Sequence, residues 1–131
     1  MKIKSVLIVD DDSISNFINV RLFKNLNIGD EISIATNGKD ALKRLEEQSL
    51  KTTLSPDLIL LDINMPVMDG FEFLKKFHSI NFSNKDKVTI AILTTSSHQK
   101  DKIKMEELGV KHYLSKPLNE ESILNLLNNI K

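Results

Sequence analysis

Acidic residues stand at the ends of two apolar segments of the sequence. Asp10, Asp11 and Asp12 follow the run "SVLIV", and Asp62 follows "LILL". Two clustered carboxylates about 4 Å apart repel each other by roughly 4 kcal/mol at an effective dielectric constant near 20, so we expect either a bound cation or a bound proton among them. Carboxylate oxygens with water are ligands that suit Mg²⁺. A carboxylate beside such an ion can act as a nucleophile toward a phosphoryl group and form an aspartyl phosphate.

Two further groups suited to phosphoryl chemistry follow later segments of the same kind. Thr94 follows the run "VTIAIL", and Lys116 follows "VKHYLS" and precedes Pro117. An ammonium group neutralises phosphoryl charge, and a hydroxyl group donates a hydrogen bond to a phosphoryl oxygen. The acids, the hydroxyl and the ammonium can act together only if the fold brings these segment ends to one edge.

The segments that must position these groups alternate in type along the chain. One series of segments has the helical period. Its first segment places Ile14, Phe17, Ile18 and Leu22 on one face, and Gly29 follows it as a stop. The other series consists of short runs typical of strands. We predict strands at 4–9, 31–36, 57–62, 88–93 and 110–115, and helices at 13–28, 38–48, 71–80, 98–108 and 121–130.

Strands that alternate with helices predict a parallel sheet covered on both faces, with right-handed crossovers. The first, third and fourth strands are continuously apolar, as in central strands, whereas the second and fifth alternate, as at edges. The order 2-1-3-4-5 satisfies both observations. We therefore predict an α/β fold: a doubly wound five-stranded sheet in a flavodoxin-like three-layer sandwich. In such sheets ligands bind at the carboxyl ends of the strands, at the switch point, here between strands one and three.

Composition limits the classes of function. The 131 residues fit one domain, 1–131, and contain no cysteine, so thiolate metal sites and disulfides are excluded. Lys+Arg and Asp+Glu both number 18, so no bulk basicity indicates direct binding to nucleic acid. No polybasic or long apolar segment indicates contact with a membrane. We expect a cytoplasmic protein.

Four motifs occur in order at the expected strand ends: "VLIVDDD" (6–12), "LILLDINMPVMDG" (58–70), "AILTTSS" (91–97) and "HYLSKPL" (112–118). With them, essentially the whole chain resembles the receiver domain of two-component response regulators, most closely the free-standing chemotaxis-regulator-like type. The resemblance implies that Asp62 accepts a phosphoryl group from a histidine kinase, a phosphotransfer protein or a small donor. It also implies Mg²⁺ bound by Asp11, Asp62 and the backbone carbonyl of Asn64, with Asp10 holding metal-bound water.

The resemblance assigns further roles beside the phosphoacceptor. Thr94 and Lys116 match the family's hydroxyl and lysine, and Tyr113 matches the aromatic residue that turns inward as Thr94 moves. The Lys116–Pro117 bond is cis in the family. Phosphorylation would then repack the face built from the fourth helix, the fifth strand and the fifth helix, which would bind an unknown downstream protein or form a homodimer. Such a protein is no enzyme beyond its own phosphorylation and dephosphorylation.

The loop after Asp62 carries the remaining expectations about the site. Pro66 and Gly70 shape this loop, and Asp69 caps the following helix. Thr95 stands where the family often has alanine, which would narrow access to Asp62. Asn64 and Ser96 occupy positions that, by resemblance, tune hydrolysis of the acyl phosphate.

Two other functions remain open at this point. Asp10 and Asp12 form an Asp-x-Asp pattern, which also occurs in phosphatases of the haloacid dehalogenase type, although those need a longer chain. A receiver that serves as an unphosphorylated scaffold is the other alternative. No histidine pair has a spacing that indicates a zinc site.

Overall fold

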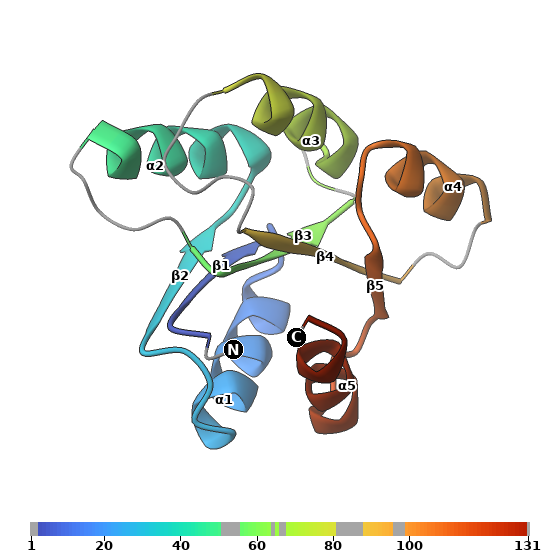
Figure 1. The fold of residues 1–131 in the computed structure, drawn as a ribbon. Coiled ribbons are helices and arrows are strands. Elements are labelled where there is room, and N and C mark those ends of the chain that lie inside the picture. The colour runs from blue at the N-terminus through green and yellow to red at the C-terminus, as the bar shows by residue number, and fades with distance from the viewer. Residues whose placement is uncertain are drawn as a thin grey trace.

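The computed structural model of the chain describes residues 3–50, 56–63, 65, 68–80, 88–95 and 99–130. Strands and helices alternate throughout (Figure 1). The strands are β1 (Ser5–Val9), β2 (Glu31–Ala35), β3 (Leu58–Asp62), β4 (Thr89–Thr94) and β5 (His112–Ser115), and the helices are α1 (Ser13–Asn25), α2 (Gly38–Leu50), α3 (Gly70–Ser79), α4 (Gln99–Glu107) and α5 (Glu120–Ile130).

The sheet is parallel, with the order β2-β1-β3-β4-β5. This order and the predicted fold class are confirmed. All five residues of β3 are buried, whereas β2 and β5, at the two edges, are largely half-buried. Continuous and alternating apolar runs therefore separated central strands from edge strands correctly, because only a strand covered on both faces must be apolar throughout.

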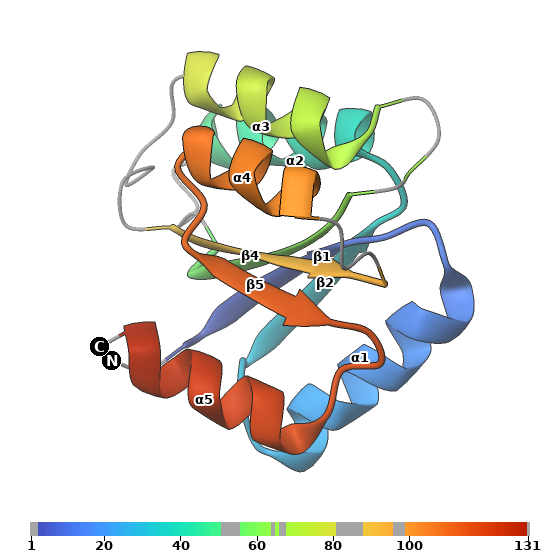
Figure 2. The ribbon, with the colours of Figure 1, turned by 90° about the vertical axis from the view of Figure 1, so that its right-hand side faces the viewer.

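Helices cover both faces of the sheet. Figures 1 and 2 show α1 and α5 on one face, and α2, α3 and α4 on the other. Each face has its own apolar cluster. Phe73, Leu74 and Met105 are buried in one cluster, and Phe23 and Ile123 in the other. Burying one such side chain contributes about 1.5–3 kcal/mol to the stability of the fold. The two clusters therefore hold the sheet, and with it the strand ends, in a fixed position.

Two aspartates cap the helices that begin beside the phosphoryl site predicted above. The Oδ1 atom of Asp12 accepts hydrogen bonds from the N–H groups of Ile14 at 3.0 Å and Ser15 at 3.3 Å. Asp69 Oδ1 accepts from the N–H of Glu72 at 2.9 Å. The Asp69 cap was predicted, and each cap contributes about 0.5–2 kcal/mol.

The apolar face predicted for the first helix does not face the core. Ile14, Phe17 and Ile18 are 70%, 64% and 48% exposed, while the helix buries Asn16, Asn19 and Phe23 against the sheet. The helix was predicted, although it ends at Asn25 rather than at residue 28. Its rotation was wrong for Ile14, Phe17 and Ile18, whereas Leu22 packs partly against the core as predicted. The helical period predicts which residues share a face of the helix, but not which element packs against that face. Here the side chain of Asn16 donates a hydrogen bond to the carbonyl of Asp10, directly after β1. None of the helices that the structure describes has the length and apolar composition needed to cross a bilayer.

Candidate functional site

The carboxyl ends of four strands bring the predicted site residues to one rim. Asp62 and Thr94 are the last residues of β3 and β4. Asp10 follows β1 directly, and Lys116 follows β5. Asp10, Asp62 and Thr94 are buried although they are polar, with exposed fractions of 1%, 7% and 1%. Buried polar groups of this kind need partners, and the neighbours at the rim supply them.

Lys116 joins the two central carboxylates. Its Nζ atom lies 2.7 Å from Asp10 Oδ2 and 3.5 Å from Asp62 Oδ2, and the Lys116 side chain is only 15% exposed. Burial by itself would lower the pKa of Lys116. The hydrogen bond to Asp10 and the negative charges of Asp10 and Asp62 outweigh burial, so the pKa of Lys116 is raised above its ordinary value. The ammonium group is therefore charged at neutral pH.

Three carboxylates at this rim fit a divalent cation. One oxygen each from Asp10, Asp11 and Asp62 lies within 4.8 Å of the others, and Asp11 is exposed while the other two are buried. Two oxygens that both contact Mg²⁺ at about 2.1 Å can lie at most about 4.2 Å apart. The three carboxylates are therefore close enough together for such an ion to be held among them. The donor set contains only oxygen, which suits a hard cation.

Two hydrogen bonds fix Asp10 in this cluster. Its Oδ1 atom accepts from the N–H of Asp12 at 3.0 Å, and its backbone carbonyl accepts from Nδ2 of Asn16 at 2.9 Å. The sequence prediction missed Asn16. One signal was available: Asn16 lies seven residues before Phe23, the apolar residue of α1 that is fully buried, and so on the same face of the helix.

Gly70 allows α3 to begin directly against the end of β3. A Cβ atom at this position would lie 2.8 Å from the carbonyl oxygen of Asp62 and 2.9 Å from the Cα atom of Ile63. Both neighbours are backbone, so neither can move without shifting the strand end. The Gly70 N–H donates to the Ile63 carbonyl at 2.9 Å. The predicted role of Gly70 in shaping this loop is consistent with that close contact.

Thr94 and Tyr113 lie on the neighbouring strands β4 and β5. The N–H of Lys116 donates to the Thr94 carbonyl at 2.9 Å, which extends the pairing of β4 with β5 to the lysine. The Tyr113 ring packs against the apolar cluster on the α3 and α4 side, and its buried hydroxyl has no hydrogen-bond partner within the described parts of the chain. Burial, and then the charge of Asp101, raise the pKa of Tyr113.

Some of the other predicted features lie within the described residues, and some do not. The Lys116–Pro117 bond is cis, as the resemblance implied, and Thr95 is exposed beside the rim. Asn64, Pro66 and Ser96 lie outside the described residues, so their predicted roles stay predictions.

The Asp-x-Asp pattern places its two acids in different environments. Asp10 is buried beside Lys116, whereas Asp12 is exposed and uses its carboxylate to cap α1. The Oδ1 atom of Asp12 is already engaged with the backbone N–H groups of Ile14 and Ser15. This arrangement favours an acceptor site centred on Asp62 over a phosphatase centred on Asp10.

Comparison with known families identifies this combination of fold and rim. The family described as the response regulator receiver domain matches residues 6–128. The chain belongs to this family. It is therefore the receiver domain of a two-component response regulator, as the sequence motifs indicated.

Individual relatives agree with the family assignment. Response regulator Rcp1 of Synechocystis is 30% identical over 98% of this chain and 86% of its own length. The crystal structure of a two-component response regulator from Cytophaga hutchinsonii is 34% identical, with a TM-score of 0.88 over 99% of this chain and 98% of that one. The Mn²⁺-bound form of Rcp1 is 29% identical, with a TM-score of 0.74 over 97% of this chain and 91% of that one.

Some relatives are much longer than this receiver. The chain is 34% identical to hybrid signal transduction histidine kinase B of Dictyostelium discoideum over 94% of its own residues, but it spans only 6% of that kinase. It spans 57% of the probable transcriptional regulator ycf29 of Porphyra purpurea, at 32% identity over 99% of this chain. Receiver domains thus occur in proteins with different additional parts.

Proposed function

We propose that this receiver accepts a phosphoryl group on Asp62 in a Mg²⁺-dependent reaction in the cytoplasm. The donor would be a histidine kinase, a phosphotransfer protein or a small phosphorylated molecule. The observation that carries the proposal is the position of Lys116, whose Nζ atom lies 2.7 Å from Asp10 and 3.5 Å from Asp62. A cation between a buried acid and the acceptor carboxylate can neutralise the negative charge that a phosphoryl group brings to Asp62.

The reaction exchanges one bond to phosphorus for another. An oxygen of Asp62 attacks the phosphorus of a phosphohistidine, the P–N bond breaks, and its electron pair returns to the imidazole. Water later attacks the acyl phosphate, releasing inorganic phosphate and the free carboxylate. The chain promotes only these two reactions of its own side chain, so it is not an enzyme acting on external substrates.

Each residue at the rim has a separate part in the proposal. Asp11, Asp62 and the backbone carbonyl of Asn64 would hold Mg²⁺, and Asp10 would hold it through water. The ion would neutralise negative charge on the phosphoryl group. Lys116 is close enough to move from the Asp62 carboxylate to a phosphoryl oxygen on the same residue. Thr94, at the end of the adjacent strand, would donate a hydrogen bond to that group.

Phosphorylation would replace the Asp62 carboxylate, with its charge of −1, by an acyl phosphate whose charge is about −1.5 to −2, and so would favour a different arrangement of the groups around it. Thr94 would move toward the phosphoryl group, and Tyr113 would follow it inward. Among the described residues no hydrogen bond holds the buried Tyr113 hydroxyl, and its ring already packs against the apolar cluster, so the movement would start from a partly inward position. The face formed by α4, β5 and α5 would then bind a downstream protein or a second copy of the chain.

The exposed side of α1 offers the donor protein a place to dock. Ile14, Phe17 and Ile18 follow the acidic cluster directly along the chain, and all three are exposed. Large apolar side chains grouped on a surface indicate a contact site. A groove beside them is lined by Phe17, Val20 and Ile34, and by Asn16, whose buried Oδ1 atom has no partner in the described structure. A helix of the donor could bury these groups while its phosphohistidine reaches Asp62.

Acetyl phosphate labelling tests the proposed acceptor. Intact-mass measurement should show one added phosphoryl group in the presence of Mg²⁺, and none after chelation or in Asp62→Asn. Asp12→Asn is the matched control, because Asp12 is acidic and adjacent but caps α1. Undiminished labelling of Asp62→Asn would reject the acceptor. Turnover of an external phosphomonoester that is lost in Asp10→Asn but kept in Asp62→Asn would instead indicate a phosphatase.

A further inference from the structure

The outer edge of β5 is open. This strand pairs with β4 on one side and is the last strand of the sheet, and no strand pairs with its other side within the described ranges. Figure 2 shows β5 running between α4 and α5, which lie above and below it. An open strand edge presents unpaired N–H and C=O groups, which can bind another extended chain.

The register of β5 identifies which backbone groups face outward. The N–H of Lys116 donates to the Thr94 carbonyl and so points toward β4. Backbone groups of alternate residues in a parallel strand point to the same side. Leu114 and His112 therefore also point toward β4, whereas the N–H and C=O groups of Tyr113 and Ser115 point toward the open edge.

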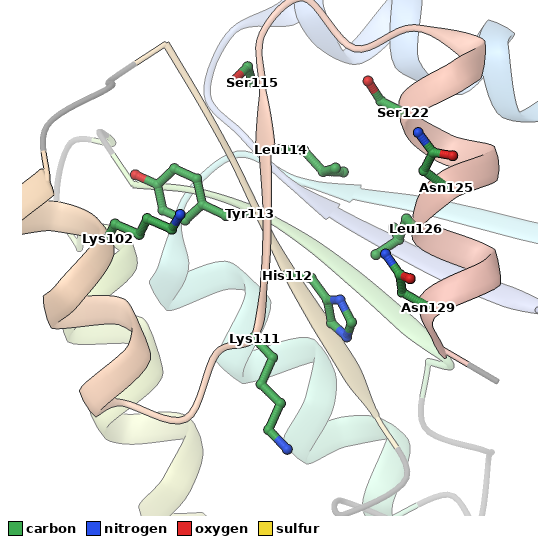
Figure 3. Close-up of a pocket in the computed structure, with 10 residues that line it drawn as sticks. All are labelled: Lys102, Lys111, His112, Tyr113, Leu114, Ser115, Ser122, Asn125, Leu126 and Asn129. Carbon is green, nitrogen blue, oxygen red and sulfur yellow. The ribbon is translucent and has the colours of Figure 1, made fainter.

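A groove of about 480 Å³ runs along this edge. Lys102 and Lys111 line one part of it, Ser122, Asn125 and Asn129 of α5 line the other, and none of its lining residues is acidic (Figure 3). Burial first, and then the charge of Lys111, lower the pKa of His112 in this groove, while the negative charge of Asp101 acts on Tyr113.

We infer that the β5 edge binds an extended, acidic segment of a partner protein, which adds to the sheet beside β5 as a sixth strand. The main-chain groups of Tyr113 and Ser115 would pair with the segment. Lys102 and Lys111 would contact its carboxylates, and the amides of Asn125 and Asn129 would donate to its polar side chains. The role of this segment in signalling rests on the proposed function, but its binding does not.

Charge distinguishes this occupant from a second copy of the chain. Two copies joined edge to edge through β5 would bring the lysines of both grooves together, and like charges across an interface oppose association. A short edge strand with lysine beside it is also how proteins prevent such pairing. An acidic segment turns the same lysines into favourable contacts. A helix would leave the outward groups of Tyr113 and Ser115 unpaired.

The edge is also connected to the phosphoryl site. Tyr113 contributes its backbone to the open edge and its ring to the cluster beside α4, and its neighbour Ile92 lies two residues before Thr94 on β4. A movement of the Tyr113 ring would therefore change how a bound segment pairs with the Tyr113 backbone. Binding should differ between the unphosphorylated and phosphorylated receiver if the proposed switch operates.

A blocked synthetic peptide of alternating valine and glutamate residues tests the inference by nuclear magnetic resonance titration of the full chain. Amide hydrogen exchange should slow at Tyr113 and Ser115, while His112 and Leu114 should change little because their N–H groups already face β4. Replacing glutamate by lysine in the peptide, or methylating alternate backbone nitrogens, should abolish binding. Lys102→Gln and Lys111→Gln should each weaken it roughly two- to fivefold.

Lys43→Gln is the control, since it removes the same charge from an exposed position on α2, and it should leave peptide affinity unchanged. Binding without new protection at Tyr113 and Ser115, equal binding of the lysine peptide, or no binding in either phosphorylation state would overturn the inference. Titration with and without beryllofluoride and Mg²⁺ covers both states. Failure of Asp62 labelling would reject the proposed function, while edge binding in the unphosphorylated chain would still support the inference.

Discussion

The Nδ2 group of Asn16 donates to the backbone carbonyl of Asp10 at 2.9 Å, inside the protein, and so ties the first helix to the acidic cluster. Asn16 is 4% exposed. A polar side chain on the sheet side of a helix costs free energy unless it is paired. The bond thus explains both why α1 buries Asn16 and why its apolar residues face outward.

Asn16→Ala should destabilise the fold by about 1–3 kcal/mol, because the buried Asp10 carbonyl loses this donor. It should also weaken divalent-cation binding several-fold, since Asp10 is then held less firmly. Chemical denaturation gives the first quantity, and calorimetric titration with Mn²⁺ gives the second. Asn19→Ala is the control: Asn19 is also buried, at 2% exposed, but its Nδ2 group makes only a long hydrogen bond to Ser15 Oγ, at 3.5 Å, among the described residues. A loss of cation affinity of the same size in Asn19→Ala would show that Asn16 acts only through stability.

The sequence pattern was compatible with the observed sheet order and placed Asp10, Asp62, Thr94 and Lys116 at the rim, but it missed Asn16. A strand such as β3, covered on both faces, must be apolar throughout, so the pattern marked β3 as central and Asp62 as the residue at its end. Rotation of α1 was not predictable in the same way. The stripe with Ile14 and Phe17 and the stripe with Asn16 and Phe23 both fit the helical period, and the periodicity does not show that Asn16 pairs with the Asp10 carbonyl.

Lys116→Met should destabilise the metal-free fold by about 1–3 kcal/mol, less than the loss of a partner in a fully buried pair, because the lysine is partly exposed. Added Mg²⁺ should restore more stability in this variant than in the parent chain, since a cation then replaces the missing one between Asp10 and Asp62. Thermal unfolding with chelator and with Mg²⁺ measures both effects. If Mg²⁺ stabilised Lys116→Met and the parent chain equally, this would contradict a shared position for Mg²⁺ and the Lys116 ammonium group.

The same ion pair has a defined pH dependence. The pKa of Lys116 is raised in the folded state above the ordinary lysine value of 10.5. Its contribution to stability is therefore fully present below the pKa of an unfolded lysine and is lost as the pH rises through the raised value. Between pH 7 and 9 the Lys116 ion pair should give a constant contribution.

Phe17→Ser should slow phosphotransfer from a histidine kinase or phosphotransfer protein without changing labelling by acetyl phosphate. Phe17 is 64% exposed, so its replacement should change stability by less than 1 kcal/mol while removing part of the apolar docking surface. The donor is first chosen as the fastest in a panel of autophosphorylated kinases, and its transfer rates to the two proteins are then compared. Leu124→Ser, on the exposed side of α5, is the control. A parallel loss with acetyl phosphate would place the defect at Asp62 rather than at docking.

Tyr113 is the only tyrosine in the chain, and there is no tryptophan, so ultraviolet absorbance reports its ionisation alone. Its pKa is raised from 10.0 by burial first and by Asp101 second. The folded chain should therefore titrate above this value and the denatured chain near it. Because the folded state holds the proton more tightly, fold stability should fall as the pH rises above about 10.

Asp101→Asn should lower the titration midpoint of Tyr113 only in part, since burial is the larger cause and remains. Asp40→Asn removes an exposed acid from α2 and should leave the midpoint unchanged. Circular dichroism at each pH verifies that the chain is still folded when the absorbance is read. A folded-state midpoint at or below that of the denatured chain would mean that the hydroxyl is solvated. Tyr113 would then already lie outside the packed cluster, and the inward movement proposed for phosphorylation would start from a different position.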